Sequence, residues 1–209
     1  MTQEQEYENK KEKRDRDCRR FIHRLSQLEA GDRAKLKRNS GNTLSESRTV
    51  IGLFYRQLIS GLNHIKEWDE ETLFLVATLY PFDKKRFANE QSQQTKEELA
   101  ELEKTNRSFG WSLHKIREKN RKEAKEKKLK DRMDGFDRRV ERLLDADGDQ
   151  LRFYLRREMH YITNQGATID WEQLLFDLLR WNHPDRYVQR RWARDYFVSR
   201  EQVTSDTTD

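Results

Sequence analysis

The chain has 209 residues, of which 39% are charged and 33% hydrophobic, and its formal net charge is +5. No stretch approaches the roughly 20 apolar residues that cross a bilayer, no apolar signal stretch opens the chain, and the single cysteine, Cys18, excludes a disulfide framework or a cysteine metal cluster. An aromatic share of 11% argues against disorder. We therefore expect a folded, cytoplasmic protein with a lean core and a charged surface.

The first predicted element is a helix at residues 4–29, whose apolar residues cluster near its end. Ala30 and Gly31 are expected to end this helix. Asp32 is then expected to cap a short basic helical turn at residues 33–38.

A second amphipathic helix is predicted at residues 46–60, after a polar loop. The helix at residues 70–80 is apolar on most sides, which favours a central position, and Pro81 ends it. A capping-box pattern predicts a short helix at residues 95–104.

The second half begins with a break at residues 106–110 and a helix at residues 111–130. Gly135 is expected to interrupt the chain before an amphipathic helix at residues 136–144. A further helix at residues 151–162 follows from apolar spacings of three and four.

Two more helices complete the predicted elements. Asp170 is expected to cap one of them, with Gln173 at the capping-box offset. Pro184 is expected at the first position of the last helix, which carries Val188 and Trp192 on its buried face.

Helix breakers are scarce and strand signals are weak, so we predict an all-α fold of two helical bundles, mostly long amphipathic helices, with no sheet. The N-terminal bundle is expected at residues 18–104, after a charged extension at residues 1–17 that frays. The C-terminal bundle is expected at residues 105–200, before a loose polar tail at residues 201–209.

The basic charge is concentrated in the middle of the chain. Between Lys104 and Arg142, fifteen basic residues stand against seven acidic ones, a net charge of +8 that exceeds the +5 of the whole chain. Such segregation is typical of phosphate binding. The alternative is a solvated helix surface stabilised by pairs such as Glu118–Lys122. It applies best to the basic stretch at residues 119–130, within the predicted basic helix at residues 111–130.

Catalytic signals are weak. The five histidines lack metal-ligand spacing, and the chain has neither a glycine-rich phosphate loop nor a strand–turn–serine motif. The arginines around Cys18 would favour a lowered thiol pKa, but one thiol without a placed partner is interpreted as inert. We expect no enzyme activity, no cofactor and no metal site.

A set of motifs in a characteristic order resembles the small subunit of the type I-E CRISPR surveillance complex (Cascade), the CasB family. The resemblance runs from about Phe21 to Phe197, and residues 119–130 are longer and more basic than the family pattern. Its motifs are the basic turn at residues 31–38, the central helix at residues 75–80, Ser112-Leu113, Arg138-Arg139 before the leucine pair 143–144, Leu155-Arg156-Arg157, residues 169–171, Asp177-Leu178, Trp181 and residues 192–197.

The resemblance implies an all-helical, non-catalytic subunit that takes part in antiviral defence. Its implied partners are the other Cascade subunits, a second copy of itself, the crRNA–target DNA hybrid and the displaced DNA strand, whose R-loop it stabilises. Neither a membrane nor a small-molecule substrate is expected.

We interpret the nucleic-acid contacts as phosphate contacts from basic side chains on one continuous face. Trp111 and Trp181 are candidates to face other subunits, although burial in the core is the usual place of a tryptophan. Two alternatives stay open: a free-standing basic helical RNA-binding protein and a structural adaptor with a solvated charged surface. The candidate nucleic-acid-binding residues are Lys37, Arg38, Arg107, Lys115, Arg117, Arg138, Arg139, Arg142, Arg156 and Arg157.

Overall fold

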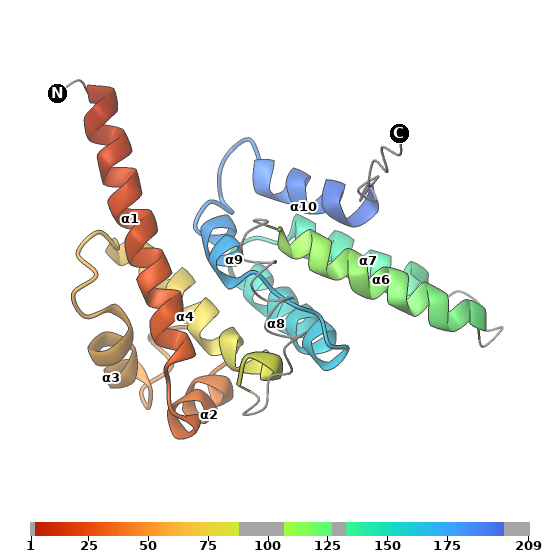
Figure 1. The fold of residues 1–209 in the computed structure, drawn as a ribbon, viewed down its shortest axis with the longest axis horizontal. Helices are drawn as coiled ribbons and strands as arrows, with labels where there is room; N and C mark the ends of the chain where they lie inside the picture. Colours follow the sequence, from red (N-terminus) through yellow and green to blue (C-terminus); the bar gives the residue numbers. More distant parts are fainter. Residues whose placement is uncertain (1–2, 88–106, 127–132, 199–209) are drawn as a thin grey trace, which may run out of the picture.

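The computed structural model describes residues 3–87, 107–126 and 133–198, and it confirms the all-α prediction (Figure 1). Within these ranges every regular element is helical. The predicted helix at residues 95–104, the tail at residues 201–209 and the end of the basic stretch at residues 127–130 lie outside the described residues.

The first half of the chain surrounds a buried central helix, α4. Seven consecutive residues of α4, Leu73 to Leu79, are buried, which confirms its predicted central position. The elements of this half are α1 (Gln3–Ser26), α2 (Ala30–Arg38), α3 (Ile51–Leu53), the π-helix η1 (Phe54–Ile59), the 3-10 turn η2 (Glu67–Asp69), α4 (Glu70–Leu79) and the 3-10 turns η3 (Tyr80–Phe82) and η4 (Lys84–Phe87).

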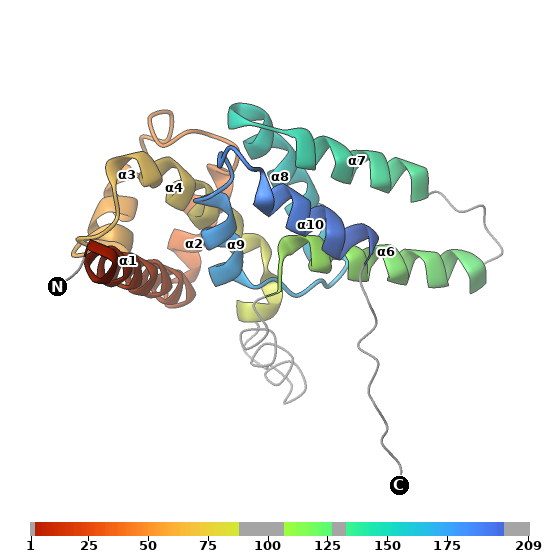
Figure 2. The same ribbon diagram turned by 90° about the horizontal axis from the view of Figure 1, so that it is seen from above.

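The second half contains the other five α-helices of the described residues. Figures 1 and 2 place α1 to α4 at one end of the molecule and α6 and α7 at the other, with α8 and α9 between them. The elements of this half are α6 (Phe109–Glu126), α7 (Met133–Asp145), α8 (Gly148–Asn164), α9 (Trp171–Leu178) and α10 (Tyr187–Phe197).

One hydrophobic core runs through both halves. α9 packs against α1 and α4, and α8 packs against α4 as well as α7. The described core residues form a single cluster that extends from Cys18 on α1 to Tyr196 on α10. The division into two bundles, with its boundaries and a fraying extension, stays a prediction, and α1 is helical without a break from Gln3.

Three predicted features of the second half are confirmed: a helix cap, a helix and a buried helix face. Asp170 is the N-cap of α9, because its side chain accepts a hydrogen bond of 2.9 Å from the backbone nitrogen of Gln173. The predicted helix at residues 151–162 lies within α8. The last helix buries Val188, Trp192 and Tyr196, as its spacing predicts.

Other boundaries were wrong. Ala30 and Gly31 begin α2 instead of ending α1, and Asp32 lies inside the first turn, where it pairs with Lys35 at 2.7 Å. Gly135 lies within α7. The helical segment of the predicted 46–60 helix starts only at Ile51, because the preceding residues form a chain of turns.

Pro184 is not the first residue of α10. Arg186 adopts a left-handed conformation with φ of 47°, and the helix starts after it at Tyr187. The Arg186 guanidinium donates a hydrogen bond of 2.6 Å to the carbonyl of Leu144. This contact joins residues 42 positions apart, so no local sequence pattern predicts it. It occurs at the residue directly before Tyr187, where α10 begins.

Candidate nucleic-acid interface

A basic hollow lies between the first half of α6 and the turn that follows α8. Its volume is about 610 Å³, and among the described residues four cationic side chains but no acidic ones line it. We call it the basic hollow; its lining residues are Lys85, Arg107, Trp111, Ser112, Lys115, Ile116, Lys119, Gln165, Gly166, Ala167 and Thr168.

The turn after α8 gives the basic hollow its wall. Gly166 has φ of +82°, which is a conformation that side chains with a Cβ rarely adopt. Two side chains of α6 then bind the backbone beyond α8: Ser112 Oγ donates to the Thr168 carbonyl at 2.7 Å, and Lys119 Nζ donates to the Gln165 carbonyl at 2.9 Å. These bonds fix the distance between the wall and α6.

Two candidate residues meet at the Trp111 ring in the basic hollow. The Arg107 guanidinium lies 4.1 Å from the ring centroid, and Lys115 Nζ lies 5.5 Å from it. Cations at this distance are attracted by the negative face of an indole. Lys115 also lies 3.7 Å from Glu118, but its side chain is about half exposed, so solvent screens that pair.

A second basic group forms where the end of α2 meets α8. Arg156 Nε donates to Ser40 Oγ at 3.0 Å, and Arg156 is an exposed residue. Lys37 lies over the Phe82 ring, with its ammonium 4.6 Å from the centroid. Arg38 is exposed on the same short helix. Arg156 thus lies beside the turn that follows α2, the helix that carries Lys37 and Arg38.

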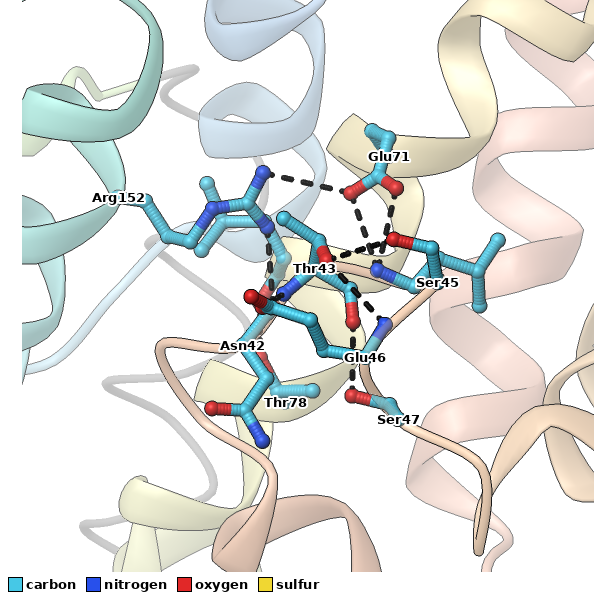
Figure 3. A network of polar contacts seen from close by, with 10 residues as sticks. Asn42, Thr43, Ser45, Glu46, Ser47, Glu71, Thr78 and Arg152 are labelled. Carbon is cyan, nitrogen blue, oxygen red and sulfur yellow. Dashed lines mark hydrogen bonds and ion pairs between the residues drawn. The ribbon is translucent and has the colours of Figure 1, made fainter.

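A loop between α2 and α3 is bound by side chains of α4 and α8 (Figure 3). Glu71 accepts hydrogen bonds of 3.1 and 3.2 Å from the backbone nitrogen of Leu44. Arg152 donates to the Asn42 carbonyl at 3.0 Å and contacts Glu71 at 3.3 Å. This network joins the first half of the chain to α8 and holds the loop beside Arg156.

Arg139 and Arg157 converge on one buried carboxylate. Glu158 is fully buried, with Arg157 Nε donating to it at 2.8 Å and Arg139 lying 3.6 Å away. The two arginine side chains are 29% and 32% exposed. Each side chain is therefore partly exposed, while its guanidinium lies beside a buried acid and offsets its charge.

The neighbours of Arg139 have other surroundings. Arg138 and Arg142 are exposed on α7 and make no hydrogen bond or ion pair with the described residues. They are one turn apart, so both lie on the same side of the helix. Adjacent helical residues point in different directions, which explains why Arg138 and Arg139 differ.

Arg117 is committed to an internal network. Its guanidinium donates to Asp137 at 2.7 Å and lies 5.1 Å from the ring centroid of Tyr196. The Tyr196 hydroxyl donates to the other Asp137 oxygen at 2.5 Å, and burial followed by this carboxylate raises the Tyr196 pKa. Arg117 thus binds α6 to α7 and α10.

The candidate residues form local groups: Arg107 with Lys115, Arg139 with Arg157, Arg138 with Arg142, and α2 with Arg156. A single continuous face stays a prediction. Sequence reasoning missed Lys85 and Lys119 as parts of the basic hollow, since Lys85 lies in a segment interpreted as a connection. The only available signal for Lys119 was its place in the basic stretch.

The cysteine and two of the histidines, His64 and His114, have structural surroundings. Burial raises the pKa of the Cys18 thiol to about 12 and outweighs the opposite effect of Arg14, which corrects the lowered value that its arginine neighbours suggested. His64 lies 2.9 Å from Asp17, and His114 binds the Tyr196 carbonyl at 2.8 Å. In the described ranges no three His, Cys, Asp or Glu side chains could hold a metal ion together.

None of the helices within the described residues is long and apolar enough to span a bilayer.

The two tryptophans expected to face partners differ in their surroundings. Trp181 follows the core alternative, because it is buried and its indole donates to the Ala146 carbonyl at 2.8 Å. Trp111 lies outside the core cluster.

Comparisons with known proteins agree on one family. The model of the family described as CRISPR-associated protein Cse2 matches residues 32–197. A CRISPR-associated protein Cse2 of Thermus thermophilus is 51% identical over 55 residues, which are 26% of this chain and 31% of that protein. The match thus spans about a third of the length of this curated relative.

Solved structures extend the likeness over most of the fold. The crystal structure of M. ruber CasB has a TM-score of 0.60 at 24% identity, covering 88% of this chain and 93% of the other. A crystal structure of a Cse2-family protein of Thermus thermophilus has a TM-score of 0.59 at 26% identity, with 87% and 97% covered. A chain of a CRISPR RNA-guided surveillance complex has a TM-score of 0.63 at 22% identity, with 88% and 94% covered.

Proposed function

The chain belongs to the CRISPR-associated Cse2 family, and from this premise we propose that it is the non-catalytic small subunit of a type I-E Cascade complex. In that role it contacts the backbone of the crRNA–target DNA hybrid and the displaced strand, and so stabilises the R-loop in antiviral defence. It works in the cytoplasm beside the other subunits and a second copy of itself.

The observation that carries this proposal is the basic hollow. Among the described residues, four cations and no acidic side chain line it, and such a site attracts phosphate groups without reading sequence. The exposed pair Arg138 and Arg142 adds charge on α7. Exchange of a DNA duplex for an RNA–DNA hybrid is nearly balanced in free energy. A few phosphate contacts are therefore enough to favour the R-loop over the closed DNA duplex.

The candidate arginines differ in their surroundings, which supports a division by role. Arg38, Arg138, Arg142 and Arg156 are exposed residues. In contrast, Arg117, Arg139 and Arg157 bind carboxylates of the chain itself. We assign the phosphate contacts to the first group and to the cations of the basic hollow, and a supporting role to the second.

The experiment uses Cascade assembled with guide RNA and compares the salt dependence of target-DNA binding. The variant is Arg138→Gln with Arg142→Gln, since both residues are exposed and neither holds a buried acid. The matched control removes the same charge from α10, at Arg190 and Arg194, which are also exposed and one turn apart.

Loss of two phosphate contacts is expected to weaken binding and to reduce the slope of log K against log salt by roughly 1.4–1.8. The control is expected to keep the wild-type slope. An unchanged slope in the α7 variant removes that pair from the proposal. Unchanged binding in variants of all the exposed candidates and of the basic hollow would instead favour a structural adaptor.

A further inference from the structure

Of the five tryptophans, three belong to the core cluster, and Trp68 and Trp111 do not. Trp111 differs from the exposed Trp68 because it is partly buried. Trp171, Trp181 and Trp192 are each no more than 2% exposed, and each indole nitrogen donates a hydrogen bond. Trp111 is only partly buried, does not belong to the core cluster and, among the described residues, donates no indole hydrogen bond. Core packing therefore does not explain this side chain.

Trp111 forms an aromatic surface inside a cationic site. It lines the basic hollow together with Lys85, Arg107, Lys115 and Lys119. The Arg107 guanidinium lies 4.1 Å from the ring centroid, and within the described part of the chain it makes no ion pair or hydrogen bond. The planar Arg107 guanidinium thus lies against the Trp111 ring. Among the described residues, no ion pair or hydrogen bond holds it in that position.

The basic hollow has the size of a ligand site. On its opposite wall Lys85 lies over Gly166, where a Cβ atom would be 3.7 Å from Lys85 Cε and 3.9 Å from its Nζ. The basic hollow, at about 610 Å³, falls within the range of roughly 300–1,000 Å³ for pockets that take small ligands. Two of its lining residues, Lys115 and Lys119, are exposed to solvent.

A ligand that satisfies both parts of the site carries a flat ring and a negative charge. An unpaired nucleotide has both, because its base stacks on an indole while its phosphates meet the cations. In a duplex each base is stacked and paired inside the helix, so it is not available to Trp111. Sites that combine an aromatic platform with a positive groove are typical of single-strand binding.

We propose that Trp111 is a stacking platform for one unpaired base, and that the basic hollow therefore prefers single-stranded to duplex nucleic acid. This inference rests on the proposed function and adds a contact to a base to the contacts with phosphates. On binding, Arg107 moves off the indole and pairs with a phosphate or stacks on the other face of the base.

The test uses the full chain and three labelled probes of equal phosphate number: a thymidine 20-mer, an abasic 20-mer and a mixed-sequence duplex. Anisotropy gives the affinity of the wild type, Trp111→Leu and Trp111→Phe. The matched control is Trp68→Leu, because Trp68 is 77% exposed and lies outside the basic hollow. Circular dichroism and melting temperature confirm that each variant folds.

The wild type is expected to bind the thymidine probe more tightly than the abasic probe by roughly 5- to 150-fold, the effect of one stacked base. Trp111→Leu is expected to lose this preference while its salt slope on the abasic probe stays that of the wild type, since no charge has changed. Trp111→Phe and Trp68→Leu are expected to keep the preference.

Two outcomes overturn the inference in distinguishable ways. Equal binding of the thymidine and abasic probes by the wild type, with a normal salt slope, refutes the stacking platform and leaves the phosphate contacts intact. No binding to any probe at low salt refutes both the platform and the phosphate contacts of the basic hollow. A preference that persists in Trp111→Leu likewise refutes the platform, because it assigns the base contact to another residue.

Discussion

The contact between α6 and α10 predicts an unusual sensitivity at Gly110. An ideal Cβ atom at this residue would lie 2.2 Å from the carbonyl oxygen of Trp192, 2.7 Å from its Cα and 2.8 Å from its carbonyl carbon. All three are backbone atoms of α10, so no side-chain rotation relieves the clash. Ordinary contact begins at 3.4 Å, so Gly110→Ala requires the two helices to separate by about 1.2 Å.

Such a separation disturbs the packing around Trp192. The Trp192 ring lies 5.2 Å from that of Phe109 and 4.9 Å from that of Trp181, and its indole donates to Asp177 at 2.6 Å. Overpacking of this kind costs ~1–3 kcal/mol and occasionally more. For a chain of this size we expect about 3 kcal/mol and a melting temperature lowered by roughly 6–12 °C.

The assay is thermal unfolding followed by circular dichroism, with Gly31→Ala as the matched control. Gly31 is also helical and exposed, and a Cβ atom there meets nothing within 4 Å. The control is expected to be as stable as the wild type or more stable by ~0.5–1 kcal/mol, because alanine favours helix. Equal melting temperatures for the Gly110 and Gly31 variants would refute the close approach as the role of Gly110.

Four further predictions concern three buried or bridging side chains. The raised pKa of Cys18, about 12, leaves roughly a thousandfold less thiolate at pH 8 than a free cysteine has, so the native chain is expected to react slowly with a thiol reagent and rapidly once denatured. Because the unfolded thiol loses its proton first, stability falls as pH rises from 9 towards 12, and Cys18→Ala is expected to flatten this fall in chemical denaturation. Glu158→Gln is expected to lower the free energy of unfolding by ~1–3 kcal/mol in the same assay, because Arg139 and Arg157 lose their charged partner. Equal stability of this variant and the wild type would show that solvent screens both ion pairs. Arg152→Ala is expected to speed hydrogen exchange at the Leu44 amide, since the link from α8 to this loop is lost, and unchanged exchange would show that Glu71 alone holds the loop.

Hydrophobic spacing determined much of the helical architecture. The run of apolar residues in α4 predicted its burial, and the spacings in α8 and α10 predicted their buried faces, because 3.6 residues per turn place such residues on one side. The cap of α9 was also predictable, since an aspartate hydrogen-bonds to a backbone nitrogen only three residues away. These features depend on neighbours in the chain.

Local chemistry failed where a distant element decided the outcome. Gly110 was interpreted as part of a helix break, yet it lies inside α6 where α10 comes closest. Pro184 and Arg186 precede α10, and Arg186 bonds to the end of α7. Glycine and proline are compatible with several backbone roles, and only packing selects among them.

The candidate site shows the same division. The net charge of +8 between Lys104 and Arg142 was visible in the sequence, as was the resemblance to a family. Which cations reach solvent was not, because Arg138 and Arg139 are adjacent in the chain while only Arg139 lies beside the buried Glu158. The sequence by itself determined the helices and the sum of the charge. The tertiary structure decided which charges are neutralised internally and which line the basic hollow, because burial and ion pairing depend on residues brought together from distant parts of the chain.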